Sequence, residues 1–152
     1  MSQLLFRTSF AMGRAALLLS LCILGIGAQA SEKTGNTKQF DGVWQTTLSC
    51  ENSHGALGYS FRFSSTIKNG VLHGEKGTPH EAGWLQIDGS LSSDGVADLY
   101  VDGLVGASAA AVGQRPAGTA YGYHVTARFS ADRAEGHRVE GRPCSVIFAR
   151  EK

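Results

Sequence analysis

Histidines, cysteines and carboxylates are the side chains here that could bind metal or transfer protons, and the histidines show no pattern that would do so. They form no His-x-His pair and no His-Glu-x-x-His motif, and none stands at zinc-ligand spacing from a cysteine. The five are His54, His73, His80, His124 and His137. We interpret them as surface or loop residues, and we expect neither a metal nor another cofactor.

One short motif resembles that of a nucleophilic hydrolase. Ser65-Thr66-Ile67-Lys68 matches Ser-x-x-Lys, in which both side chains must share a helical face. The surrounding residues alternate as in a strand, where an offset of three places the two side chains on opposite faces. No Gly-x-Ser-x-Gly elbow, phosphate loop or dinucleotide fingerprint follows residue 30. The sequence therefore predicts a protein that is not an enzyme.

Two sets of charged residues are explained better by turns and surface contacts than by ion-binding sites. Three aspartates are each followed by glycine, which is typical of tight turns, and their spacing fits no single calcium loop: Asp88, Asp94 and Asp102. Near the end of the chain, Arg138 and Arg142 flank Glu140. This pattern indicates a solvated face or a cross-strand ion pair rather than an anion site.

The first thirty residues have the pattern of an export signal. Arg7 and Arg14 precede an apolar run over residues 15–26, and Ala28-Gln29-Ala30 provides a small-x-small cleavage site. A membrane-spanning helix is the alternative, but about 12 apolar residues fall short of the roughly 20 that cross a bilayer.

We therefore expect three segments: a cleaved signal peptide over residues 1–30, a flexible leader over 31–39 and a single domain over 40–152. The mature chain would be exported to the periplasm or secreted, without inserting into a membrane. About 122 residues suit one domain. Removing two arginines and no acid takes the formal net charge from +1 to about −1, which excludes the cationic excess that nucleic-acid binding requires.

Cleavage of the signal peptide would also leave only two of the three cysteines in the mature chain. Cys22 is removed, and Cys50 and Cys144 remain in a compartment that permits disulfides. Their bridge would close a loop of about 95 residues and stabilise the fold by about 2–4 kcal/mol, mainly by restricting the unfolded chain. Two buried free thiols are the alternative.

The elements that must position these residues are strands. Period-two alternation between turn signals predicts strands over residues 43–50, 59–68, 71–76, 84–91, 96–105, 119–130 and 137–150, the last of them broken or free on one side at Pro143. Asn69-Gly70 predicts a type I′ hairpin. Residues 106–118 and 131–136 are predicted loops, the first with at most one helical turn.

Seven or eight short strands in meander order predict an antiparallel up-and-down β-barrel, since closure buries one face and removes the edges. A two-sheet sandwich is the alternative. The barrel pairs its first strand with its last, and these two strands contain Cys50 and Cys144. The disulfide would then close the barrel.

Three stretches resemble known barrels. Gly42-Val43-Trp44 is similar to the Gly-x-Trp signature of lipocalin-like and avidin-like proteins, whose tryptophan plugs one barrel end. GVLHG (residues 70–74) and GTAYGYHV (118–125) resemble strands of the bacterial avidins. The FDGVW and GRPC stretches also resemble small exported bacterial proteins. The resemblance implies a barrel with a concave space, and association into dimers or tetramers.

Most positions that bind biotin in the avidins have chemically different side chains in this sequence. Their first-strand asparagine falls at Thr46 and the next serine at Cys50, while their third-strand tyrosine and serine fall at Lys76 and Thr78. Their stacking tryptophan falls at Tyr123. Only Thr78 and Tyr123 keep comparable side chains, so biotin is not the expected ligand.

We expect an exported, non-catalytic barrel that binds a small molecule or short peptide at its mouth. The candidate ligand residues are Trp44, Thr46, Thr78, Tyr121 and Tyr123, with the 106–118 loop as a lid. The alternative is a protein-binding module such as a secreted hydrolase inhibitor, which predicts an exposed apolar patch or a rigid protruding loop.

Overall fold

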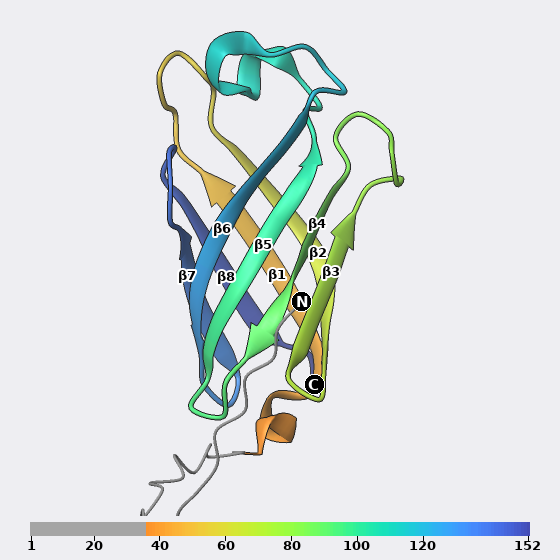
Figure 1. Cartoon of the computed structure of the whole chain (residues 1–152), viewed down its shortest axis with the longest axis vertical. Helices are drawn as coiled ribbons and strands as arrows, with labels where there is room; N and C mark the ends of the chain where they lie inside the picture. Colours follow the sequence, from red (N-terminus) through yellow and green to blue (C-terminus); the bar gives the residue numbers. More distant parts are fainter. Residues whose placement is uncertain (1–35) are drawn as a thin grey trace, which may run out of the picture. The chain divides into compact units, whose positions relative to one another are not determined.

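The computed structural model describes residues 36–152 as a closed, eight-stranded antiparallel barrel (Figure 1). The strands follow one another around the barrel in chain order, and β8 pairs with β1. This confirms the predicted all-β class and up-and-down topology, and it excludes the sandwich. The predicted signal peptide and residues 31–35 of the predicted leader lie outside the described residues.

The strands are β1 (Gly42–Cys50), β2 (Tyr59–Lys68), β3 (Val71–Lys76), β4 (Leu85–Leu91), β5 (Val96–Leu104), β6 (Ala120–Phe129), β7 (Arg133–Arg138) and β8 (Cys144–Arg150). Three short 3₁₀ helices accompany them: η1 (Thr37–Phe40), η2 (Ser108–Ala110) and η3 (Val112–Gln114). Between residues 36 and 152 there is no helix long and apolar enough to span a membrane.

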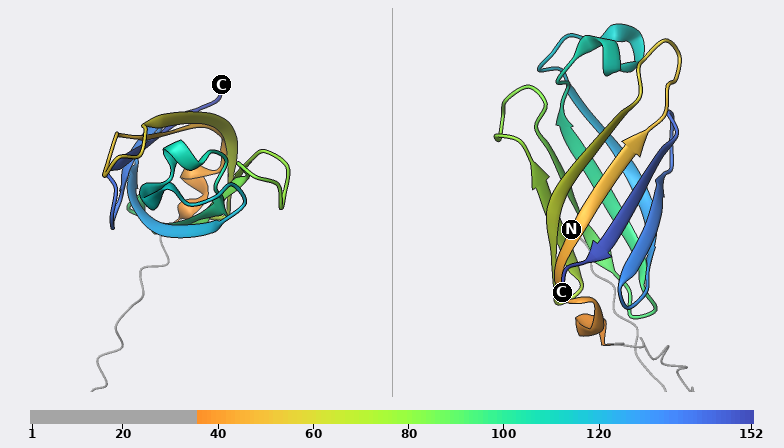
Figure 2. Two further views of the ribbon diagram at one scale, coloured as in Figure 1. Left: turned by 90° about the horizontal axis from the view of Figure 1, so that it is seen from above. Right: turned by 180° about the vertical axis from the view of Figure 1, so that it is seen from behind.

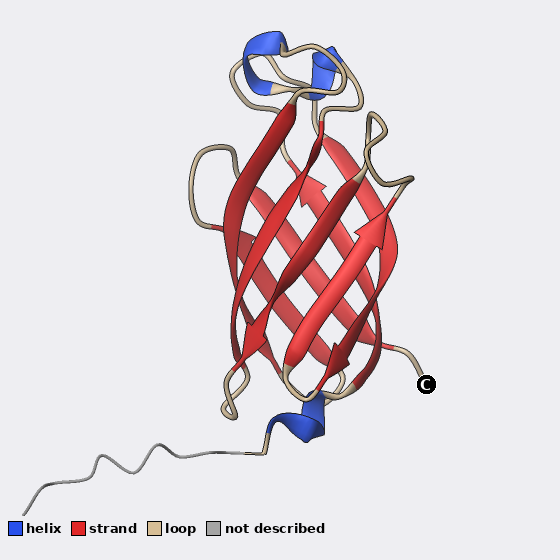
Figure 3. Ribbon diagram, turned by 45° about the vertical axis from the view of Figure 1, so that its right-hand side comes forward, coloured by secondary structure: helices blue, strands red, loops and turns tan. Residues whose placement is uncertain are grey.

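The two barrel ends differ. We call the end where β1, β3, β5 and β7 finish the mouth, and the opposite end the closed end. The η2 and η3 turns lie at the mouth and η1 at the closed end (Figures 1 and 3). Because η1 covers Thr37–Phe40, the predicted leader is ordered from there on.

The hairpin between β2 and β3 follows its sequence signal. Asn69 and Gly70 both have positive φ, at 53° and 75°, as a type I′ turn requires. Lys68 and Val71 pair directly on either side of it. The predicted two-residue turn is confirmed.

The last predicted strand is two strands, and the loop prediction for residues 131–136 is wrong from Arg133 onward. Ala134 is buried opposite Phe148, while Arg133 and Glu135 point outward and form an ion pair at 2.9 Å. The inward positions of β7 are small because a Cβ at Gly136 would lie only 2.7 Å from that of Ala127. Because β7 combines small inward residues with charged outward residues, its composition resembles that of a loop.

Aromatic packing fills the closed end. Trp44 is fully buried, and its indole Nε1 donates to the carbonyl of Phe40 at 3.0 Å. Phe129 contacts Trp44 edge-on, with ring centroids 5.2 Å apart. Arg150 lies 4.7 Å over the Trp44 ring and donates to the carbonyls of Asp41 and Gln39, each at 2.7 Å. The η1 turn is thereby held across this end of the barrel.

A disulfide joins the closing strands. Cys50 and Cys144 are direct partners in the β1–β8 register, and their sulfurs are bonded at 2.01 Å. Both side chains are buried inside the barrel. Figure 2 (right) shows β1 beside β8 along this seam. The predicted bridge is confirmed, and the free-thiol alternative is excluded.

Replacing both cysteines by alanine should lower the free energy of unfolding by about 2–4 kcal/mol, because the unfolded chain loses a cross-link that spans most of the domain. Urea unfolding followed by tryptophan fluorescence measures this change. A reductant should shift the unfolding midpoint of the wild type and leave that of the double variant unchanged. Equal midpoints for both proteins without reductant would contradict a stabilising seam.

Candidate functional site

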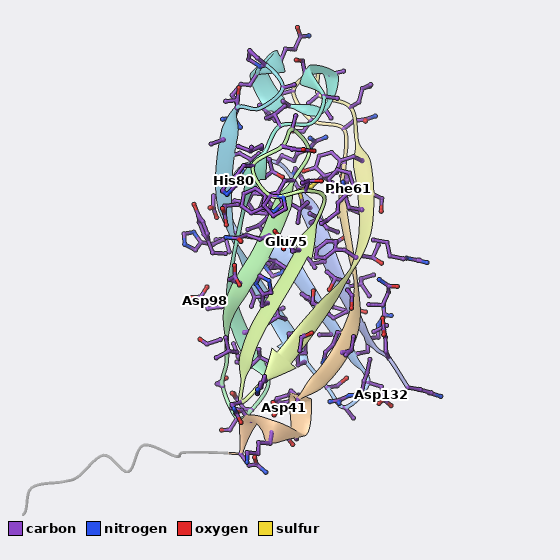
Figure 4. All side chains as sticks on the ribbon, turned by 90° about the vertical axis from the view of Figure 1, so that its right-hand side faces the viewer. Asp41, Phe61, Glu75, His80, Asp98 and Asp132 are labelled. Atoms are coloured by element: carbon purple, nitrogen blue, oxygen red, sulfur yellow. A yellow bond between two sulfur atoms is a disulfide. The ribbon has the colours of Figure 1, made fainter. Side chains whose placement is uncertain are left out.

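A cavity of about 520 Å³ occupies the mouth half of the barrel. Its wall combines the inward side chains at the mouth ends of the strands with the underside of the β5–β6 connection. Figure 4 places Phe61, one of the wall residues, in the half of the barrel away from Asp41 at the closed end. The barrel interior is thus packed at one end and open at the other.

The β5–β6 connection, residues 106–118, forms a lid. Seen from above in Figure 2 (left), η2 and η3 lie over the barrel opening. Backbone bonds close the base of the lid: Val105 donates to Thr119 at 2.9 Å and Gly118 donates to Val105 at 2.7 Å. The sequence predicted a loop with at most one helical turn; the structure has two 3₁₀ turns, and Gly113 inside the second has a φ of 73°.

Arg142 ties the lid to the barrel. The residue is 5% exposed, and its guanidinium donates to the carbonyls of Glu51, Leu57 and Ala110. These acceptors come from the β1–β2 loop and the lid, and Arg142 itself lies in the β7–β8 turn. The Leu57 amide adds a bond to the carbonyl of Ala109 at 2.7 Å. Three mouth segments are therefore joined through one buried cation.

Aromatic rings form much of the cavity wall. Tyr121 and Tyr123 lie stacked on β6 with centroids 6.2 Å apart, and Tyr59 and Phe61 lie 4.8 Å apart on β2. The members of each pair are two residues apart on their strand and so share a face, and all four line the cavity. Gly103, opposite Tyr121 in the register, makes room for the phenol, since a Cβ there would lie 2.8 Å from the Tyr121 hydroxyl.

The Tyr123 hydroxyl is buried and has no hydrogen-bond partner among residues 36–152. Burial raises the pKa of Tyr123 above its ordinary value, and the neighbouring phenols of Tyr59 and Tyr121 raise it further. Burial is also the main reason that the pKa values of Tyr59 and Tyr121 are raised. All three phenols are therefore neutral at physiological pH, and the cavity wall retains an unpaired O–H group.

Cations complete the wall, which contains Lys76, Arg115, Arg138 and Arg142 but no aspartate or glutamate. The Lys76 ammonium lies 4.3 Å over the Phe61 ring, and the Arg138 guanidinium lies 4.0 Å over the Tyr123 ring. In the described part of the chain, none of the four cations forms a salt bridge. The wall is therefore aromatic and positively charged.

The interpretation of Arg138 and Arg142 as a solvated face or ion pair is wrong. The Glu140 carboxylate instead accepts from the His124 amide at 2.8 Å, which is the main reason that its pKa is lowered. The β7–β8 turn breaks the alternation between Arg138 and Arg142, so the two arginines turn into the mouth. A signal was present in the alternation of β3, which continues from buried Leu72 through Gly74 to Lys76.

The structure brings together two of the five predicted ligand residues. Tyr121 and Tyr123 line the cavity beside the lid, as expected. Trp44 lies in the packed closed end, and Thr46 is buried with its hydroxyl 2.6 Å from that of Ser65. Thr78 is exposed in the β3–β4 loop and does not line the cavity.

Searches for related proteins leave the site to be interpreted from its own chemistry. No family model, no curated protein and no solved structure matches this chain. Within residues 36–152, no group of three or more histidine, cysteine or acidic side chains is placed to hold a metal ion. The avidin-like resemblance stays an expectation about the family.

Replacing Arg142 by methionine should loosen the lid. The variant removes every guanidinium bond to the mouth carbonyls, and bonds to charged groups contribute about 1.5–3 kcal/mol each. Amide hydrogen exchange at Leu57 and across residues 106–118 should accelerate at least about tenfold, while exchange within the strands stays unchanged.

Arg115→Met is the matched control, because Arg115 also lines the cavity but donates only to the carbonyl of Ala120, at 3.2 Å. Its exchange rates should remain close to those of the wild type. Unchanged lid exchange in Arg142→Met would show that Arg142 does not tether the lid.

Alkaline pH should destabilise the fold through the buried phenols. Unfolded tyrosines ionise near pH 10, whereas the raised pKa values keep Tyr59, Tyr121 and Tyr123 protonated in the barrel. The unfolded state then binds fewer protons, so the free energy of unfolding falls by up to about 1.4 kcal/mol per pH unit for each phenol above pH 10.

Tyr123→Phe should reduce this fall, as measured by urea unfolding at neutral and alkaline pH. Because the hydroxyl has no partner, the same variant should be at least as stable as the wild type at neutral pH. Tyr100→Phe, at an exposed position on β5, should retain the wild-type alkaline fall. An equal fall in all three proteins would contradict the role of Tyr123.

Proposed function

We propose that the protein is an exported, non-catalytic barrel that binds one small molecule in the mouth cavity beneath the lid. The observation that carries the proposal is the uneven filling of the barrel. An eight-stranded barrel is just wide enough to be filled by side chains or to hold one small ligand. Here the closed end is filled and the mouth holds a cavity of about 520 Å³, within the usual size range of ligand pockets.

The chemistry of the wall supports binding rather than catalysis. In the described part of the chain, the wall residues include no histidine, carboxylate, serine or cysteine. The three tyrosines have raised pKa values and so do not act as bases near neutral pH. The other ionisable groups of the wall are cations, which suit recognition of a ligand.

The disulfide supports the exported location. Such bridges persist in oxidising compartments such as the periplasm and the extracellular space. Cys50 and Cys144 close the barrel at the mouth, next to the lid tether at Arg142. We infer that the oxidising compartment maintains the rim around the cavity.

A protein-binding module is the second candidate, and exposed apolar side chains favour it. Leu57, Val112 and Val139 are 59%, 43% and 58% exposed, and they lie on three different segments of the mouth end. A partner would bind the outer faces of these loops, whereas a small molecule would bind beneath them. Filling the cavity therefore separates the two candidates.

Binding of N-phenylnaphthylamine, an uncharged dye that fluoresces in apolar surroundings, tests the proposed function. We expect saturable binding to one site, with an affinity on the order of micromolar. Ala111→Trp should weaken this binding at least about tenfold, because Ala111 is buried in the lid and faces the cavity, so that an indole occupies ligand space.

Ala109→Trp is the matched control, since Ala109 is exposed on the same lid and does not line the cavity. It should bind the dye as the wild type does. Thermal unfolding of both variants checks that the barrel is intact. Dye binding that is equal in the two tryptophan variants would exclude the cavity as the site.

A further inference from the structure

Positive charge is concentrated in the cavity. The mature chain has a predicted formal net charge of about −1, yet the cavity wall carries four cations and no acid. Two carboxylates on the strands and turn that form the mouth are engaged elsewhere: Glu140 accepts from the His124 amide, and Asp102 accepts from the side-chain amide of Gln86 at 3.0 Å. The cations therefore gather at the cavity although the chain as a whole is not basic.

The four cations differ in what their N–H groups bind. Arg142 is committed to backbone carbonyls, and Arg115 is exposed on the lid with a bond to Ala120. Arg138 donates only from Nε, to the Glu140 carbonyl, so its two terminal amino groups have no hydrogen bond within residues 36–152. Lys76 has one long bond, at 3.4 Å, to the carbonyl of Gly83. Lys76 and Arg138 therefore have donors available to a ligand.

Both residues also point inward. Lys76 continues the buried row of Leu72 and Gly74 on β3, and Arg138 continues the row of Ala134 and Gly136 on β7. Each is partly buried and lies over an aromatic ring of the wall. Desolvating a cation without a partner is costly, and cation–π contacts offset only part of that cost.

We infer that the ligand is a small organic anion with an apolar, planar body. This inference rests on the proposed function and adds the charge of the ligand to it. Arg138 and Lys76 are the cations available to the anionic group of the ligand, and they face the same cavity from opposite walls, on β7 and β3. The apolar body lies among the rings of Tyr59, Phe61 and Tyr121, under the alanines of the lid.

A pair of dyes tests the charge directly. Anilinonaphthalene sulfonate carries an anionic group on a planar apolar body, and N-phenylnaphthylamine is its uncharged counterpart. The wild type should bind the sulfonate about tenfold more tightly than the neutral dye. Raising the ionic strength should weaken binding of the sulfonate and leave binding of the neutral dye unchanged. Ala111→Trp should weaken both.

The variants Arg138→Gln and Lys76→Gln identify the residues. Each should weaken binding of the sulfonate about tenfold and change that of the neutral dye less than about twofold, because only the charge partner is lost. Arg128→Gln and Lys68→Gln remove the same charges from exposed positions of β6 and β2. These controls should bind both dyes as the wild type does.

The outcomes separate the two proposals. If neither dye binds, the proposed function fails. If the neutral dye binds at the cavity but the sulfonate binds no more tightly and shows no salt dependence, the cavity stands and the anion inference is overturned. Should the two glutamine variants lose both dyes through misfolding, the salt dependence of the wild type still decides the inference.

Discussion

The pairing of β1 with β8 is the constraint on which the rest of this structure depends. It runs from Trp44 opposite Arg150 at one end to Cys50 opposite Cys144 at the other, and it removes the two edges that an open sheet would expose. Once the sheet is closed, each strand has one row of side chains inside the barrel. The residues that flank or end β8 then hold both barrel ends, with Arg142 bonded to the mouth segments and Arg150 to the η1 segment.

At each end of the barrel an arginine lies over an aromatic ring and binds backbone carbonyls, but one end is packed and the other contains a cavity. Arg150 lies over Trp44, whose indole and neighbouring phenylalanines fill the barrel, so the arginine seals a packed core. Arg142 lies 5.0 Å over the Tyr59 ring and holds a lid above open space. In both places the guanidinium satisfies backbone carbonyls that loops leave unpaired, which a lysine or an apolar residue would do less completely. Whether a barrel end is filled or open therefore depends on the side chains below the arginine, and not on the hydrogen bonds of the arginine itself.

Most of the fold could be predicted from the sequence because period-two alternation, turn residues and two cysteines are local signals. β7 could not, because the small inward residues Ala134 and Gly136 carry almost no hydrophobic signal and are required only by the barrel interior that they face. Of the candidate site, Tyr121 and Tyr123 could be predicted from alternation and from the adjacent loop. Lys76 continues the inward row of β3, but a charged residue at a strand end is usually solvated, so that signal is weak. Arg138 carried no such signal, because residues 133–136 of its strand were predicted as a loop, and only closure of the barrel turns both residues toward a shared cavity.

The lid and the barrel differ in how they are stabilised, and this difference determines how a ligand could enter. The strands are joined by continuous hydrogen-bonded ladders around a buried core. The lid is largely exposed, with Ala111 its one buried residue, and it is attached by a few bonds, chiefly those from Arg142 and Leu57. Segments with little buried apolar surface open at a lower free energy than the core unfolds. The lid can therefore open while the β1–β8 seam stays closed, so that exchange of a ligand does not require the barrel to unfold.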